Sequence, residues 1–113
     1  MNFFDPSEFT CPCCKKGNPQ TELYDLLKLA RLYADIPFVL NSAVRCEKHN
    51  KEVGGSPTSS HLDGWAVDIR VQNSHERFRV VYGLIQAGFN RIEVRDTWVH
   101  ADCDPSKEQE VLW

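Results

Sequence analysis

The sequence predicts an α+β protein in which a small, mostly antiparallel β-sheet is backed by helices. Two segments have helical periodicity, short apolar runs lie between them, and two strand-like runs near the C-terminus are separated by three residues. The elements follow in the order helix, strand, helix, strand, helix and hairpin. With 113 residues, 42% of them hydrophobic and 26% charged, the chain has the size and composition of one globular domain, residues 1–113.

The first half of the chain is predicted to contain two helices and one strand. Residues 1–19, rich in cysteine, are expected to form an irregular arm laid over the domain. In 20–34 apolar residues recur at steps of three and four, which predicts an amphipathic helix. The apolar run 36–40 follows as an early or edge strand, and 45–53 is expected to be a short polar helix that ends at two glycines.

The second half supplies the remaining strands and the last helix. Residues 65–71 are predicted to form a short buried strand. A helix should follow, capped by Ser74 and stopped by Gly88, with an apolar stripe at Phe78, Val81, Leu84 and Ile85. Residues 91–94 and 98–101 are expected to pair as a hairpin, whereas the charged tail from 105 to 113 shows no predicted element.

Charge and hydropathy exclude several partners. The net charge is −3 and the sequence pI is about 5.8, so no basic surface for nucleic acid is expected. No apolar stretch approaches the roughly 18 residues needed to span a bilayer. The N-terminus lacks the basic start and apolar run of a secretory signal. We therefore expect synthesis in the cytoplasm. We also expect a monomer.

The central feature of the sequence is the segment 59–68 together with His100. His61 and His100 would supply two neutral metal ligands and Asp68 an anionic one, which leaves a fourth tetrahedral position open, as in catalytic zinc sites. Gly64 allows a close backbone turn between His61 and the next strand. An ionised carboxylate in an apolar run, as at Asp68, is costly unless a cation or hydrogen-bond donors compensate it.

Each of these three residues also has an ordinary structural interpretation. His61 could be a loop histidine, His100 a hydrogen-bonded core histidine and Asp68 a salt-bridge partner. The three together, with the neighbouring serine and glycine in place, favour the metal site. His49 and His75 fall in predicted helices and are expected on the surface.

The pattern Ser-x-His-x-x-Gly-x-Ala-x-Asp followed by Trp-x-His resembles the zinc peptidases that cut bacterial cell-wall peptides. These are the D-Ala-D-Ala carboxypeptidases, D,D-dipeptidases and L-alanyl-D-glutamate endolysins, which share their fold with the hedgehog signalling domain. Residues 41–50 and 53–55 also resemble this superfamily. The opening Phe-Thr-Cys-Pro-Cys-Cys at 9–14 is similar to small phage and prophage members.

The resemblance implies zinc-dependent hydrolysis of peptidoglycan stem peptides, with one Zn²⁺ held by His61, Asp68 and His100. Such enzymes need a general base for the attacking water. The family usually supplies it three residues before the last histidine, where this chain has Thr97. Asp96 is therefore the preferred base, and Glu93 is the alternative.

Three further residues match the superfamily pattern or lie within it. Arg45 corresponds to the arginine that binds a substrate carboxylate or steadies the developing oxyanion, for which a planar, permanently charged guanidinium is suited. Ser59 and Ser42 are expected to hydrogen-bond near the site and orient its ligands. A solvated arginine and plain loop serines are the alternatives.

The five cysteines cannot all pair with one another, because their number is odd. Cys11 and Cys14 have the spacing of half a zinc knuckle, which Cys46 or Cys103 could complete. A second, structural metal ion at Cys11 and Cys14, packed free thiols and one disulfide all stay open.

Three functional hypotheses follow. The preferred one is a zinc peptidase, of D,D-carboxypeptidase or L-Ala-D-Glu endopeptidase type, acting on the cell wall after holin-type release or as a virion component. The second is a catalytically inactive zinc-containing binding domain of the same fold, supported by Thr97. The third is a zinc-ribbon interaction module centred on the cysteines, which leaves the two histidines and Asp68 unexplained.

Overall fold

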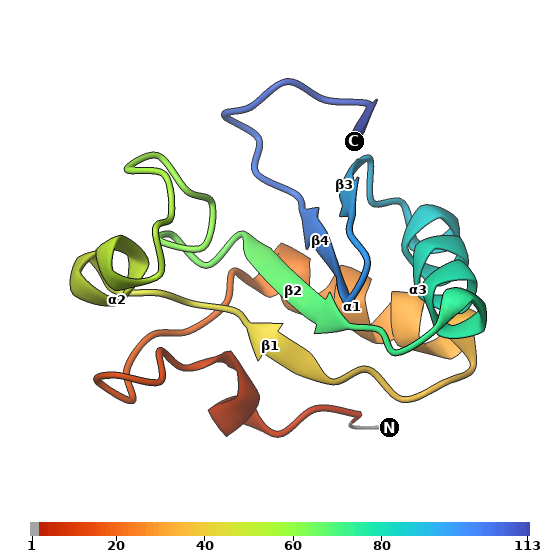
Figure 1. Ribbon diagram of the computed structural model, residues 1–113, viewed down its shortest axis with the longest axis horizontal. Helices are drawn as coiled ribbons and strands as arrows, with labels where there is room; N and C mark the ends of the chain where they lie inside the picture. The colour runs from red at the N-terminus through yellow and green to blue at the C-terminus, as the bar shows by residue number, and fades with distance from the viewer. Residues whose placement is uncertain (1–2) are drawn as a thin grey trace.

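The computed structural model describes residues 3–113 and shows three α-helices, five strands and a short 3-10 helix, η1 (Figure 1). In chain order the elements are η1 (Pro6–Phe9), α1 (Thr21–Ala34), β1 (Leu40–Ser42), α2 (Glu47–Glu52), β2 (Ala66–Arg70), α3 (Ser74–Ala87), β3 (Arg91–Val94), β4 (Trp98–Asp102) and β5 (Val111–Leu112). The predicted α+β class is confirmed.

The strands form one sheet in the order β1-β2-β4-β3-β5. All neighbouring strands run antiparallel except β3 and β5, which are parallel. Helices α1 and α3 pack together on one side of this sheet (Figure 1). Because successive side chains of a strand point to opposite faces, the two sides differ in chemistry.

Alternation along β2 and β4 places the core on the helix side and polar residues on the other. Val67 and Ile69 of β2 and Val99 of β4 are fully buried in the core. Asp68 lies between Val67 and Ile69, and His100 lies between Val99 and the buried Ala101. Asp68 and His100 therefore project from the opposite face. The open face of the sheet therefore carries the polar residues that the sequence analysis singled out.

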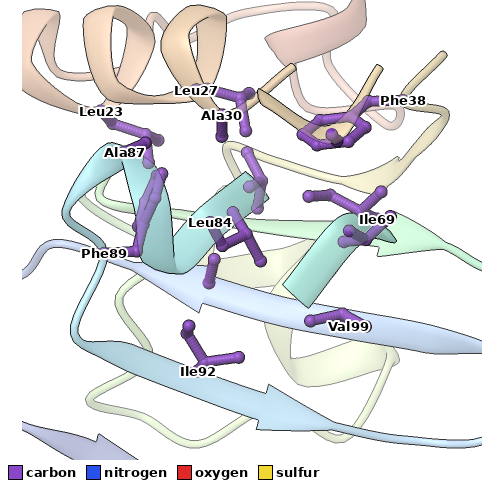
Figure 2. Close-up of a cluster of buried hydrophobic side chains, with 14 of the residues drawn as sticks. Leu23, Leu27, Ala30, Phe38, Ile69, Leu84, Ala87, Phe89, Ile92 and Val99 are labelled. Carbon is purple, nitrogen blue, oxygen red and sulfur yellow. The ribbon is translucent and has the colours of Figure 1, made fainter. Parts of the chain in front are cut away.

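The contact between α1 and α3 depends on a glycine. A Cβ added at Gly83 would lie 2.4 Å from the carbonyl oxygen of Ala30 and 2.8 Å from the Cβ of Ala34. No larger residue fits there without moving the backbone of a neighbouring helix. Beside this contact, Leu27 of α1 and Leu84 of α3 join the buried cluster between helices and sheet (Figure 2).

This close packing corrects the predicted apolar stripe of the last helix. Phe78 and Ile85 are 62% and 52% exposed, whereas the buried residues of α3 are Val80, Gly83, Leu84 and Ala87. The face with small residues turns inward because it allows the two helices to approach, which leaves the bulkier apolar face outside. The N-cap is Asn73 rather than Ser74, since the Asn73 side chain accepts a hydrogen bond from the Glu76 N–H. Gly88 ends the helix as predicted, in the left-handed conformation.

The predicted strand 36–40 lies too early in the chain. The observed β1 begins at Leu40, which pairs with Ile69, and it ends at Ser42, which pairs with Asp68. Phe38 is instead buried as an anchor in the hydrophobic core. The apolar residues of 36–40 therefore indicated a segment that packs into the core before β1 begins, and not the strand itself.

Both ends of the chain carry more structure than the sequence indicated. In the arm, η1 interrupts the irregular backbone and Phe9 is buried, with its carbonyl accepting a hydrogen bond from the Val44 N–H at 3.0 Å. In the tail, β5 adds a parallel strand beside β3. The helices predicted at 20–34 and 45–53 are confirmed as α1 and α2. Within residues 3–113, no helix has the length and apolar character needed to cross a lipid bilayer.

Candidate active site

His61, Asp68 and His100 come together on the open face of the sheet. One potential ligand atom from each lies within 4.8 Å of the other two. Asp68 Oδ1 is 3.2 Å from His61 Nε2 and 2.9 Å from His100 Nδ1. The β2–β4 ladder pairs Asp68 directly with His100, so regular strand geometry fixes two of the three side chains.

His61 reaches this point from the loop before β2. Gly64 has a φ of +77°, and a Cβ there would lie 2.7 Å from the carbonyl oxygen of Asn18, so the loop requires glycine. The His61 carbonyl accepts a hydrogen bond from the Arg45 N–H, and the His61 N–H donates to the Ser59 hydroxyl oxygen at 3.2 Å. Ser59 therefore holds the backbone of His61.

The outer nitrogen of each imidazole has its own hydrogen-bond acceptor. His61 Nδ1 lies 2.7 Å from the carbonyl oxygen of Ala43, and His100 Nε2 lies 2.8 Å from Asp102 Oδ2. A nitrogen that donates to such an acceptor leaves the other ring nitrogen free to bind a metal, which is the usual arrangement around zinc-binding histidines. The inner nitrogens both face Asp68, so these residues fit a zinc ion.

Electrostatics at the centre also favour a cation. Burial would raise the pKa of Asp68, but hydrogen bonds from His100 and His61 and the charges of both imidazoles hold it well below its usual value. Burial would lower the pKa of His100, but its hydrogen bonds to Asp102 and Asp68 and the charges of these carboxylates raise it to about 9. The two carboxylates thus stabilise positive charge at this position.

Asp102 is a site residue that the sequence analysis missed. It is only 1% exposed, and its second oxygen accepts hydrogen bonds from Arg91 Nε at 2.7 Å and the Asp104 N–H at 3.2 Å. The signal was present in the spacing, because a residue two positions after His100 in a strand lies on the same face. Asp102 orients the imidazole of His100.

Arg45 lies beside the centre, at the start of the segment that leads into α2. Its guanidinium donates to the Ser42 hydroxyl at 2.9 Å, to Asn50 Oδ1 at 3.3 Å and to Asp68 Oδ2 at 3.3 Å. Ser42 is thus a direct partner of Arg45. The structure brings both predicted residues to the edge of the candidate metal centre.

A cavity of about 300 Å³ adjoins Asp68. Arg45 and His49 line it from the side of α2, and Trp98 lines it from β4. His49 is half-buried here, which corrects its expected surface position. A charged donor, an imidazole and an indole ring therefore line a cavity beside the candidate metal centre.

The two candidate bases lie in different surroundings. Asp96 is exposed in the loop between β3 and β4, where its carbonyl accepts a hydrogen bond from Arg77. Thr97 is exposed in the same loop. Glu93 is half-buried on β3 and pairs with His100 in the β3–β4 ladder, and its carboxylate accepts a hydrogen bond from Arg95 Nε at 2.6 Å.

The C-terminal residue, Trp113, lies beside the candidate metal centre. The Trp113 ring lies 6.1 Å from the imidazole of His100, centroid to centroid. Backbone hydrogen bonds with Ile92 and Val94 hold Trp113 against β3. The tail, which carried no predicted element, thus covers one side of His100.

Four of the five cysteines form a second cluster. The sulfur atoms of Cys11, Cys13, Cys14 and Cys46 all lie within 4.8 Å of one another, and the described chain contains no disulfide. Burial opposes ionisation of Cys11, but backbone N–H groups of Cys46, Cys13 and Cys14 lower its pKa to about 6. Cys103 lies outside the cluster, and burial with nearby carboxylates raises its pKa to about 12.

A two-histidine, one-carboxylate ligand set on the open face of a small α+β sheet is typical of zinc hydrolases, in which water takes the fourth position. The family model for peptidase M15 matches residues 2–102, which is most of the chain. The chain therefore belongs to the peptidase M15 family, as the resemblance implied. A comparison with curated proteins gave no match.

Proposed function

We propose that this protein is a zinc-dependent metallopeptidase that hydrolyses peptidoglycan stem peptides. The observation that carries the proposal is the convergence of His61, Asp68 and His100, with the outer nitrogen of each imidazole already hydrogen-bonded. Membership of the peptidase M15 family supports the same reaction class. When bound, zinc polarises a scissile carbonyl and lowers the pKa of water to about 7.

Glu93 is the general base that the geometry supports best. It is paired with His100 across the ladder, and side chains of directly opposed residues project from the same face with Cβ atoms roughly 5 Å apart. Asp96 lies in the exposed loop, separated from His100 by the first residues of β4. Glu93 would first release its hydrogen bond with Arg95 and accept one from the attacking water. It would then take a proton from this water and return it to the leaving amine.

Arg45 is the residue we assign to the substrate. Its guanidinium is held by Ser42 and Asn50, so its position does not depend on substrate. A planar guanidinium can bind a peptide carboxylate through two parallel hydrogen bonds. Substrate would then lie in the cavity beside Asp68, with His49 and Trp98 as its walls.

Digestion of defined muropeptides, followed by mass spectrometry, tests the proposal and identifies the bond. Zinc-loaded wild type is compared with chelator-treated protein, Glu93→Gln and Asp96→Asn. Loss of a terminal D-Ala defines a D,D-carboxypeptidase, and a cut after L-Ala defines an L-Ala-D-Glu endopeptidase. Absence of any cleavage by zinc-loaded wild type would refute the proposed activity.

A catalytically inactive zinc-containing binding domain is the second candidate. Thr97 at the expected position of the base and the pairing of Glu93 with Arg95 favour it. This candidate predicts that zinc-loaded protein binds muropeptides without cutting them. Calorimetric titration beside the digest separates the two functions.

We also propose that the protein reaches the cell wall through a holin-type route or as a virion component. The support is the similarity of residues 9–14 to small phage and prophage members. Immunoblotting of purified particles against lysate fractions tests which route applies. Absence of the protein both from purified particles and from the cell-wall fraction during lysis would contradict both routes.

A further inference from the structure

We propose that Cys11, Cys13, Cys14 and Cys46 bind a structural zinc ion, separate from the catalytic centre. The two groups share no residue. The cysteine site would require only metal and thiolates, so it does not depend on the proposed peptidase activity.

The sulfur positions approach those of a tetrahedral tetrathiolate site. Cys11 Sγ lies 3.6 Å from both Cys13 Sγ and Cys46 Sγ, which are 3.2 Å apart, and Cys14 Sγ lies within 4.8 Å of all three. Tetrahedral zinc with Zn–S bonds of about 2.3 Å separates its sulfur atoms by about 3.8 Å. To admit the ion, Cys13 Sγ and Cys46 Sγ would have to separate by about 0.6 Å, and Cys14 Sγ would have to take up a similar spacing of about 3.8 Å.

Backbone hydrogen bonds shape the loop that carries three of the ligands. The Lys15 N–H donates to the Cys11 carbonyl at 2.8 Å, and the Cys11 N–H donates to the Lys16 carbonyl at 2.9 Å. Lys15 has a positive φ of 59°, which closes the turn. This turn holds Cys11, Cys13 and Cys14 close together.

Cys46 brings the fourth sulfur from a distant part of the sequence. It is the N-cap of α2, and its sulfur accepts a hydrogen bond from the His49 N–H at 3.4 Å. Cys46 directly follows Arg45, and the neighbouring Val44 is already hydrogen-bonded to Phe9 of the arm. A metal ion here would fasten the N-terminal arm to the segment that positions Arg45.

Alternative states of the four thiols explain the cluster less well. One disulfide would pair only two of the four sulfur atoms and would not explain why the other two lie within 4.8 Å of them. Clustered thiolates repel one another unless a cation lies between them, and soft thiolate ligands select zinc among common divalent ions. Zinc is therefore the metal we use as the probe.

Zinc counting after gel filtration tests the site. Inductively coupled plasma mass spectrometry should find two zinc ions per wild-type chain. His61→Ala/His100→Ala and Cys13→Ser/Cys46→Ser should each retain one, whereas the control Cys103→Ser should retain two. An unchanged zinc count in the double cysteine variant would overturn the proposal, whatever its peptidase activity.

Cobalt spectroscopy avoids the risk that a cysteine variant fails to fold. Cobalt(II) added to reduced His61→Ala/His100→Ala should give an intense thiolate-to-metal charge-transfer band and the visible bands of tetrahedral cobalt. Absence of both bands, or a Cys13–Cys46 disulfide in protein purified without oxygen, would contradict a metal site.

Release of the arm supplies an independent structural measurement. Chelation of zinc should speed tryptic cleavage after Lys15 and Lys16 several-fold in the same double histidine variant. Equal cleavage rates with and without zinc would show that no metal fastens the arm.

Discussion

Glu93 lies directly opposite His100 in the antiparallel ladder between β3 and β4. The pairing places a half-buried carboxylate on the same face of the sheet as the last predicted metal ligand. For this reason we propose Glu93 on the strand, rather than Asp96 in the hairpin loop, as the general base. The pairing follows from strand register, so it does not require an unusual turn.

Replacement of Glu93 by Gln should lower kcat by about 10²–10⁴-fold, because general-base catalysis contributes this much. Zinc content should stay unchanged, since Glu93 is not one of the proposed zinc ligands. Asp96→Asn is the matched control and should keep wild-type kcat. Steady-state kinetics on a defined muropeptide, with zinc measured on the same samples, check the prediction. Loss of activity in Asp96→Asn alone would instead make Asp96 the base.

Replacement of Asp102 by Asn should weaken zinc binding by about 10–100-fold, as for other residues that orient a metal-binding histidine. The amide loses the negative charge that faces His100 Nε2 and Arg91 Nε. Competition with a fluorescent chelator measures the affinity, and circular dichroism verifies the fold. An affinity equal to wild type would show that Asp102 serves only the ion pair with Arg91.

Replacement of Arg45 by Lys should raise KM by roughly 10–100-fold, because one hydrogen bond to a charged group contributes about 1.5–3 kcal/mol. A lysine keeps the charge but cannot form the two-pronged contact with a carboxylate. Arg31→Lys, on α1, is the control on the other side of the sheet. An unchanged KM in Arg45→Lys would remove Arg45 from substrate binding.

Replacement of Gly83 by Ala should lower the free energy of unfolding by about 1–3 kcal/mol, the usual cost of overpacking. The new methyl group would collide with the backbone of α1 at Ala30. Urea denaturation measures this change, with exposed Gln86→Ala on the same helix as control. Equal stability of the two variants would contradict the close contact between α1 and α3.

The parts of the site that local sequence could predict are those set by short-range pattern. His61, Gly64 and Asp68 lie within eight residues, and the structure brings the two predicted ligands to His100. The spacing from His100 places Asp102 on the same face, but its hydrogen bonds to His100 and Arg91 depend on side-chain conformations that the local sequence does not determine.

The errors in the predicted fold also arise from long-range packing, which the local sequence does not show. Periodicity alone favoured Phe78 and Ile85 as the buried face of α3, but close contact with α1 selects the face of Gly83. The apolar Phe38 indicated a strand, although it packs in the core before β1 begins. The parallel pairing of β5 with β3 has no local signature in the charged tail.

The proposed catalytic centre is tested by measuring the rate of muropeptide hydrolysis as zinc is returned to metal-free protein. Wild type should recover activity as the centre formed by His61, Asp68 and His100 fills. His100→Ala should stay inactive at the same zinc concentrations, with Cys103→Ser as a recovering control. Hydrolysis by metal-free protein, or equal recovery in His100→Ala, would contradict the proposed catalytic centre.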